Sequence, residues 1–125
     1  MKEECEKIQS YLEITCSSDP NEIIGRISDL SVYMARTSQM LADAKKEVSI
    51  IKKSAIAKEI IELLTHNIAL SATTQKAIID GIGIEEQHLV DWIERLNRTC
   101  THQIDGLRSI LSYERELLTL NKSGY

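Results

Sequence analysis

The sequence predicts an all-α fold: a bundle of three to four long helices whose contacts follow the heptad pattern of coiled coils. Three observations lead to this prediction. Apolar residues recur at alternating steps of three and four over two long stretches. Between Arg26 and Asp80 there is neither glycine nor proline, and no stretch sustains the apolar–polar alternation of a strand. We therefore expect one helical-bundle domain over residues 1–125.

Two helices are predicted near the N-terminus. The first is expected over residues 2–16, with Ile8 and Leu12 on its inner side. The second is expected to begin after Asp19, which is a good N-cap and is followed by the only proline of the chain. Glu22, three residues after Asp19, completes the pattern of a capping box.

A long apolar seam runs from Ile23 to Ala55, and Thr37 is its only polar member. Its positions are Ile23, Ile27, Leu30, Met34, Thr37, Leu41, Ala44, Val48, Ile51 and Ala55. At 1.5 Å per residue this seam is roughly 50 Å long. Such a seam needs a partner of similar length to exclude water, so a second long helix is expected beside it.

The seam loses its phase after Ala55, so either the helix bends near residues 54–58 or another face becomes buried. Residues 71–74 have low helix propensity and are a second weak point. The spacing leaves open whether residues 26–80 form one helix or two. The Gly81-Ile82-Gly83 run is expected to end the helical segment, because glycine readily adopts the left-handed conformation.

The last helix is predicted over residues 85–120 and is expected to pack antiparallel to the seam. Its inner positions are Leu89, Ile93, Leu96, Cys100, Ile104, Leu107, Leu111 and Leu118. Two acid-before-base pairs at i,i+4 favour this helix, Asp91 with Arg95 and Glu94 with Arg98. Residues 121–125 are expected to fray.

The composition indicates a cytoplasmic chain. The first seven residues are charged and lack the apolar core of a signal peptide, and no apolar stretch approaches the roughly 18 residues of a membrane span. Three cysteines without a secretion signal are expected to be free thiols. The net charge of −4 argues against a general nucleic-acid coat, although a local basic face remains compatible with it.

The residues that could carry chemistry do not form an enzyme or metal motif, so we expect a non-enzymatic protein without a cofactor. Cys100 and His102 lie two apart and point to different sides of a helix, so they cannot share a metal ion. The enzymatic alternative is a small helical hydrolase that uses Glu59, Glu62 and His66. Solvated helix surface is the simpler interpretation of those three residues.

A basic strip on this acidic protein suggests an anion-binding site. In the middle of the seam helix, six basic residues outnumber Asp43 and Glu47. An aromatic ring beside an arginine can hold a base and a phosphate. The candidate ligand-binding residues are Tyr33, Arg36, Lys45, Lys52, Trp92 and Arg95. In the alternative interpretation the lysine stems cover the seam and the aromatic rings pack on helix flanks.

Three stretches resemble small, uncharacterised all-helical accessory proteins of bacteriophages and prophages of gut bacteria. They are residues 29–36, residues 40–46, and residues 101–108 together with Ser112 and Tyr113. The resemblance spans most of the chain but includes no catalytic motif, so it transfers no functional residue. It implies a phage accessory protein that neutralises a host defence by stoichiometric binding or assists genome replication and recombination.

These observations predict a binding protein that works in the host cytosol, with no membrane partner. The leading hypothesis is an inhibitor of host defence that binds a host protein or sequesters an anionic nucleotide. A homo-oligomer is expected, because the seam exceeds what one short helix could cover. The alternative is a nucleic-acid-binding accessory protein in phage replication or recombination.

Overall fold

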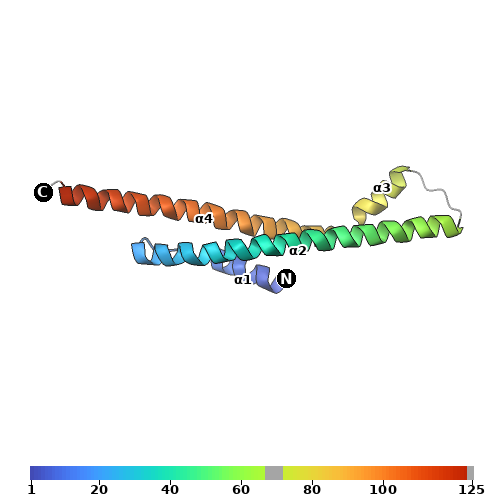
Figure 1. Ribbon diagram of the computed structural model, residues 1–125, viewed down its shortest axis with the longest axis horizontal. Helices are drawn as coiled ribbons and strands as arrows, with labels where there is room; N and C mark the ends of the chain where they lie inside the picture. Colours follow the sequence, from blue (N-terminus) through green and yellow to red (C-terminus); the bar gives the residue numbers. More distant parts are fainter. Residues whose placement is uncertain (67–71, 124–125) are drawn as a thin grey trace.

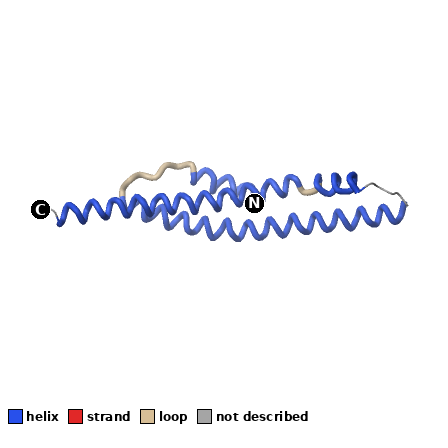
Figure 2. The backbone as a smooth tube through the Cα atoms, turned by 90° about the horizontal axis from the view of Figure 1, so that it is seen from above, coloured by secondary structure: helices blue, strands red, loops and turns tan. Residues whose placement is uncertain are grey.

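The computed structural model describes residues 1–66 and 72–123, and these residues form four helices and no strand. The helices are α1 (Lys2–Leu12), α2 (Pro20–His66), α3 (Ala72–Gly81) and α4 (Ile84–Ser123). Figures 1 and 2 show α2 and α4 side by side and antiparallel, with α1 against this pair and α3 near the far end of α2. The predicted all-α bundle is therefore confirmed. None of the described helices combines the length and apolarity needed to cross a membrane.

The core lies between α2 and α4 and is closed on one side by α1. Every position of the predicted seam from Ile23 to Ala55 is buried or half-buried. The largest cluster joins all three helices through Cys5, Ile8, Met40, Ala44, Val48, Val90, Ile93 and Leu96. A second cluster joins Leu30 to Cys100 and Ile104. The seam of α2 therefore packs against a long helix of the same chain, α4, in the predicted antiparallel orientation.

A polar contact fixes the register of α2 against α4. Thr37, the one polar member of the seam, is fully buried. The amide nitrogen of Asn97 lies 2.9 Å from the Thr37 hydroxyl and 3.0 Å from both the Met34 carbonyl and the Ser38 hydroxyl. The Thr37 hydroxyl donates in turn to the Met34 carbonyl. Sliding either helix by one turn would leave the half-buried Asn97 amide without these acceptors, and a polar group removed from water without a partner is costly.

The first helix is shorter than predicted, because it ends at Leu12 rather than residue 16. Side chains from the two long helices take the carbonyl groups that another helical turn would have used. Arg26 donates to the carbonyls of Tyr11 and Ile14, both at 2.9 Å. Gln103 donates to the Leu12 carbonyl at 2.9 Å. The helix end is therefore satisfied by tertiary contacts that no local pattern reveals.

The start of α2 follows the prediction in part. The Asp19 carboxylate accepts a hydrogen bond from the Asn21 amide at 3.4 Å, as an N-cap does. Glu22, however, does not close the capping box on the Asp19 amide. That amide donates to the Ser17 hydroxyl, and the hydroxyl donates to Glu22. The Ser17 hydroxyl therefore bridges the Asp19 amide and the Glu22 carboxylate, which a capping box would join directly.

The described residues between 26 and 80 lie in two helices, and the phase break after Ala55 does not interrupt the first of them. Instead, apolar side chains of α2 after Ala55 become exposed to solvent, and Ile60 and Ile61 are more than half exposed. Ser71 lies outside the described residues, and α3 begins directly after it. As predicted, the Gly81–Gly83 run ends α3, and Gly83 has a φ of 77°.

The last helix extends beyond its partner. It reaches Ser123, so residues 121–123 continue the helix that was expected to end at residue 120. Figure 1 shows its C-terminal end projecting past the start of α2. The prediction that Leu118 is an inner residue is wrong, since its side chain is 59% exposed. The heptad pattern continues there, but no helix of the described residues lies opposite.

Candidate functional site

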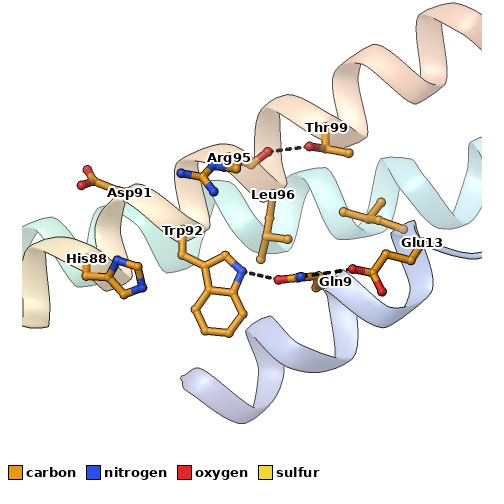
Figure 3. Close-up of a pocket in the computed structure, with 9 residues that line it drawn as sticks. Gln9, Glu13, His88, Asp91, Trp92, Arg95, Leu96 and Thr99 are labelled. Carbon is orange, nitrogen blue, oxygen red and sulfur yellow. Dashed lines mark hydrogen bonds between the residues drawn. The ribbon is translucent and has the colours of Figure 1, made fainter.

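A cleft between α1 and α4 contains two of the six predicted ligand-binding residues. Its volume is about 440 Å³, within the range of small-molecule sites. Residues of α1 and the turn after it form one wall, and one face of α4 forms the other (Figure 3). The cleft is lined by Gln9, Leu12, Glu13, His88, Asp91, Trp92, Arg95, Leu96 and Thr99.

The indole of Trp92 is held in the cleft by a chain of hydrogen bonds. Its ring nitrogen donates to the side-chain oxygen of Gln9 at 2.7 Å. The amide nitrogen of Gln9 donates to the Glu13 carboxylate at 3.2 Å. Both partners lie on or directly after α1, so docking of α1 sets the angle of the ring. A half-buried ring with its polar atom satisfied can still offer a flat face to a ligand.

Arg95 lines the same cleft as Trp92, and its side chain is exposed (Figure 3). The predicted Asp91–Arg95 ion pair is wrong: the Asp91 carboxylate accepts from Gln87 at 3.0 Å instead. The other predicted pair is confirmed, since Arg98 lies 3.7 Å from Glu94. Among the described residues, the Arg95 side chain has no ion-pair or hydrogen-bond partner.

Two carboxylates limit the negative charge that a ligand of this cleft can carry. Glu13 and Asp91 both line it, against the single guanidinium of Arg95 and the imidazole of His88. Each carboxylate already accepts one hydrogen bond from a glutamine, and each keeps further acceptor capacity. The cleft therefore suits a ligand with one anionic group and several amino or hydroxyl donors, rather than a highly charged anion.

A second hollow continues the cleft toward the α3–α4 turn and includes Lys52. Its volume is about 320 Å³, and it shares His88 and Asp91 with the first cleft. Lys52 is half-buried there, whereas Lys45, one heptad earlier on α2, is exposed and outside both hollows. The structure thus places Lys52 next to the Trp92 cleft and Lys45 away from it.

The other two predicted residues, Arg36 and Tyr33, hold α1 against α2. Arg36 forms an ion pair with Glu4 through two hydrogen bonds, and this contact lowers the pKa of the Glu4 carboxyl. Tyr33 packs against Tyr11 with ring centroids 4.8 Å apart. The six predicted residues therefore do not converge on one site. Trp92 and Arg95 share a cleft, Lys52 adjoins it, and Tyr33, Arg36 and Lys45 lie elsewhere.

Comparisons with protein-family models, with curated proteins and with solved structures gave no match to this chain. The phage resemblance therefore stays a prediction.

The residues at the C-terminal end of α1 that complete the cleft were not predicted from the sequence. Gln9 on α1 and Glu13 directly after it lie one turn apart and belong to no motif. Their only sequence signal is the i,i+4 spacing of an amide and a carboxylate, which is common on helix surfaces. Their role depends on which face of α4 receives α1, and only the tertiary structure shows this.

The remaining chemical candidates do not gather into a site. Cys100 is buried in the core, as predicted, and burial raises the pKa of its thiol, while His102 is exposed. Glu59 is half-buried with one carboxylate oxygen unpaired. The His66 side chain lies outside the described part of the chain. Within the described residues, no group of three histidine, cysteine or acidic side chains could hold a metal ion.

Proposed function

We propose that this chain is a non-enzymatic, phage-type binding protein that captures a nucleoside monophosphate in the α1–α4 cleft. The observation that carries the proposal is the guanidinium of Arg95, which has no partner among the described residues, beside the fixed indole of Trp92. An anionic group and a planar ring in one ligand would satisfy both. In this role the protein would act in the host cytosol as a stoichiometric sink, without chemical turnover.

The indole supplies the recognition of a base. Stacking on an aromatic ring contributes about 1–3 kcal/mol per base and depends little on base identity. Because Gln9 fixes the Trp92 ring before binding, little side-chain entropy is lost when the ligand arrives. The carboxylates of Glu13 and Asp91 would accept hydrogen bonds from the amino and hydroxyl groups of base and sugar.

The charge of the cleft determines how many phosphate groups the ligand can carry. One guanidinium can hold one phosphate by a charge-assisted, two-pronged hydrogen bond. A triphosphate would bring further negative charges toward Glu13 and Asp91, and Lys52 is the one additional lysine or arginine among the residues that line the two hollows. We therefore expect a monophosphate to bind more tightly than the corresponding triphosphate.

The test uses the only tryptophan of the chain as its reporter. Titration with adenosine, guanosine, cytidine and uridine monophosphates should change Trp92 fluorescence saturably, with one ligand per cleft. Arg95→Gln should weaken binding about tenfold or more, because a charged hydrogen bond is lost. Arg98→Gln is the matched control, since Arg98 lies outside the cleft and pairs with Glu94.

Three results would contradict the proposal. One is the absence of any fluorescence or calorimetric response to all four monophosphates. The other is equal weakening by Arg95→Gln and Arg98→Gln, which would indicate a general charge effect rather than a site. Release of free phosphate from a bound nucleotide would contradict the non-enzymatic assignment.

A lysine face on α2 favours a second function, binding of a nucleic-acid backbone. The face consists of Lys45, Lys46, Lys52 and Lys53, which lie within two helical turns. Three of them are exposed, and none of the four forms an ion pair with a described residue. Four cations without partners could replace counterions along a single strand.

Salt dependence tests the nucleic-acid function. If all four lysines contact phosphates, the logarithm of the affinity for single-stranded DNA should fall with log salt with a slope of roughly −3. Replacing Lys46 and Lys53 by glutamine should reduce that slope by about half. Lys2→Gln with Lys7→Gln, on α1, is the control and should leave it unchanged. No mobility shift at low salt would eliminate this function.

A further inference from the structure

The C-terminal end of α4 carries an apolar stripe that no part of the described chain covers. Its members are Ile110, Tyr113, Leu117 and Leu120, with exposures from 38% to 65%. The spacing of three, four and three residues is that of a coiled-coil seam. The stripe lies past the start of α2: Leu30 packs on Cys100 and Ile104, so Pro20 lies opposite roughly residue 111 of the antiparallel α4.

We propose that a second copy of this chain docks on this stripe, with the two α4 ends antiparallel. The stripe is self-complementary about residue 115 when one helix is inverted. Ile110 then faces Leu120 of the second copy, and Tyr113 faces Leu117. Each end covers the other along its whole projecting length. The proposal does not depend on the ligand of the α1–α4 cleft.

A hollow at the base of the stripe supports this arrangement. It has a volume of about 390 Å³ and is bounded by the segment after α1 and by α4. Ile14, Leu107 and Ile110 are among the apolar residues that line it. In the antiparallel register, Leu120 of the second copy lies at the level of Ile110. The hollow is therefore placed to receive that leucine.

Sterics decide between antiparallel and parallel pairing. The segment from Leu12 to Cys16 lies against the same face of α4 as Ile110, since both line the hollow. In a parallel pair, two such segments would have to fit between α4 helices that approach to about 8–10 Å. In the antiparallel pair, only the last residues of each α4, from about Leu120 onward, reach the level of that segment in the other copy, so the two segments do not meet between the helices.

Repulsion between glutamates weakens the antiparallel pair slightly, and this effect distinguishes it from a parallel pair. Glu114 and Glu116 flank the stripe on its two sides, about 80° from its centre, while Arg115 points away. In an antiparallel pair, each glutamate approaches its own counterpart in the second copy. A like-charge pair on an exposed helix surface changes an equilibrium constant by only about twofold. In a parallel pair, the flanking partners would be Ser109 and Asn121 instead.

Sedimentation equilibrium of the full chain over a wide concentration range tests the proposal. The wild-type chain should form a dimer. Leu117→Glu should reduce the association constant on the order of a hundredfold, because each dimer loses two buried leucines. Leu118→Glu is the matched control: this leucine is adjacent and also exposed, but it lies off the stripe. Circular dichroism should show the same helicity in both variants.

The glutamate variants test the orientation. Glu114→Gln combined with Glu116→Gln should tighten an antiparallel dimer about fourfold, because two like-charge pairs are removed. A dimer unaffected by these substitutions would overturn the antiparallel arrangement. A wild-type chain that stays monomeric, or a dimer that Leu118→Glu disrupts more than Leu117→Glu, would overturn the proposed interface.

Discussion

Replacing Ile93 by alanine is expected to lower the free energy of unfolding by about 2–5 kcal/mol, the usual cost of such a deletion in a packed core. Ile93 is fully buried at the point where three helices meet, and its cluster includes Ile8 of α1 and Met40 of α2. Neighbours from three separate elements cannot all move to fill the space. The measurement is chemical denaturation followed by circular dichroism at one protein concentration.

Ile84→Ala on the same helix is the control for that experiment. The Ile84 side chain is 65% exposed, so its truncation should change the unfolding free energy by no more than about 0.5 kcal/mol. Equal losses in the two variants would mean that the three-helix core is not packed as described. Both residues lie on α4, and both substitutions remove the same atoms.

Arg26→Met is expected to destabilise the protein by about 2–3 kcal/mol, because charged hydrogen bonds are lost from a half-buried site. Its guanidinium donates to the Tyr11 and Ile14 carbonyls and lies 4.0 Å from the Tyr11 ring centre. Methionine keeps much of the apolar stem but leaves those carbonyls without this donor. The effect should be local, since Arg26 connects the end of α1 to the long helices.

Hydrogen exchange separates this local effect from a global one. In Arg26→Met, the amides of α1 should exchange faster, while those in the middle of α2 and α4 change less. Arg98→Met is the control, because an exposed ion pair contributes about 0–1 kcal/mol. Uniform acceleration along the whole chain would contradict the assigned role. If α1 loosens, Trp92 should also lose its fixed angle, because Gln9 moves with α1.

The helices and their pairing were predictable from sequence because they follow local periodicity. The seam from Ile23 to Ala55 required a long apolar partner, and the matching length of the last helix indicated which segment supplies it. The helix stop at Gly81–Gly83 was predictable for a similar reason: Gly83 has a positive φ, a backbone conformation that only a few residue types tolerate. Both signals are intrinsic to a short stretch of chain.

The candidate site was predictable only in part. Trp92 and Arg95 lie three residues apart on one helix, so local geometry already places them on one face. Arg36 and Tyr33 are also three residues apart, yet Arg36 forms an ion pair with Glu4 of α1 and Tyr33 packs against Tyr11 of α1. Whether an aromatic–arginine pair stays open therefore depends on where α1 docks, and that is decided by contacts distant in sequence.

By itself, the sequence determined the fold class, the two long helices and the antiparallel burial of their seams, because helical periodicity is a property of neighbouring residues. The tertiary structure decided where α1 ends, that Arg95 has no side-chain partner among the described residues, and that Leu118 stays exposed. These outcomes depend on which groups meet across helices and on how far one helix extends past another. A heptad pattern specifies that a face is apolar, but only the spatial arrangement shows whether anything covers it.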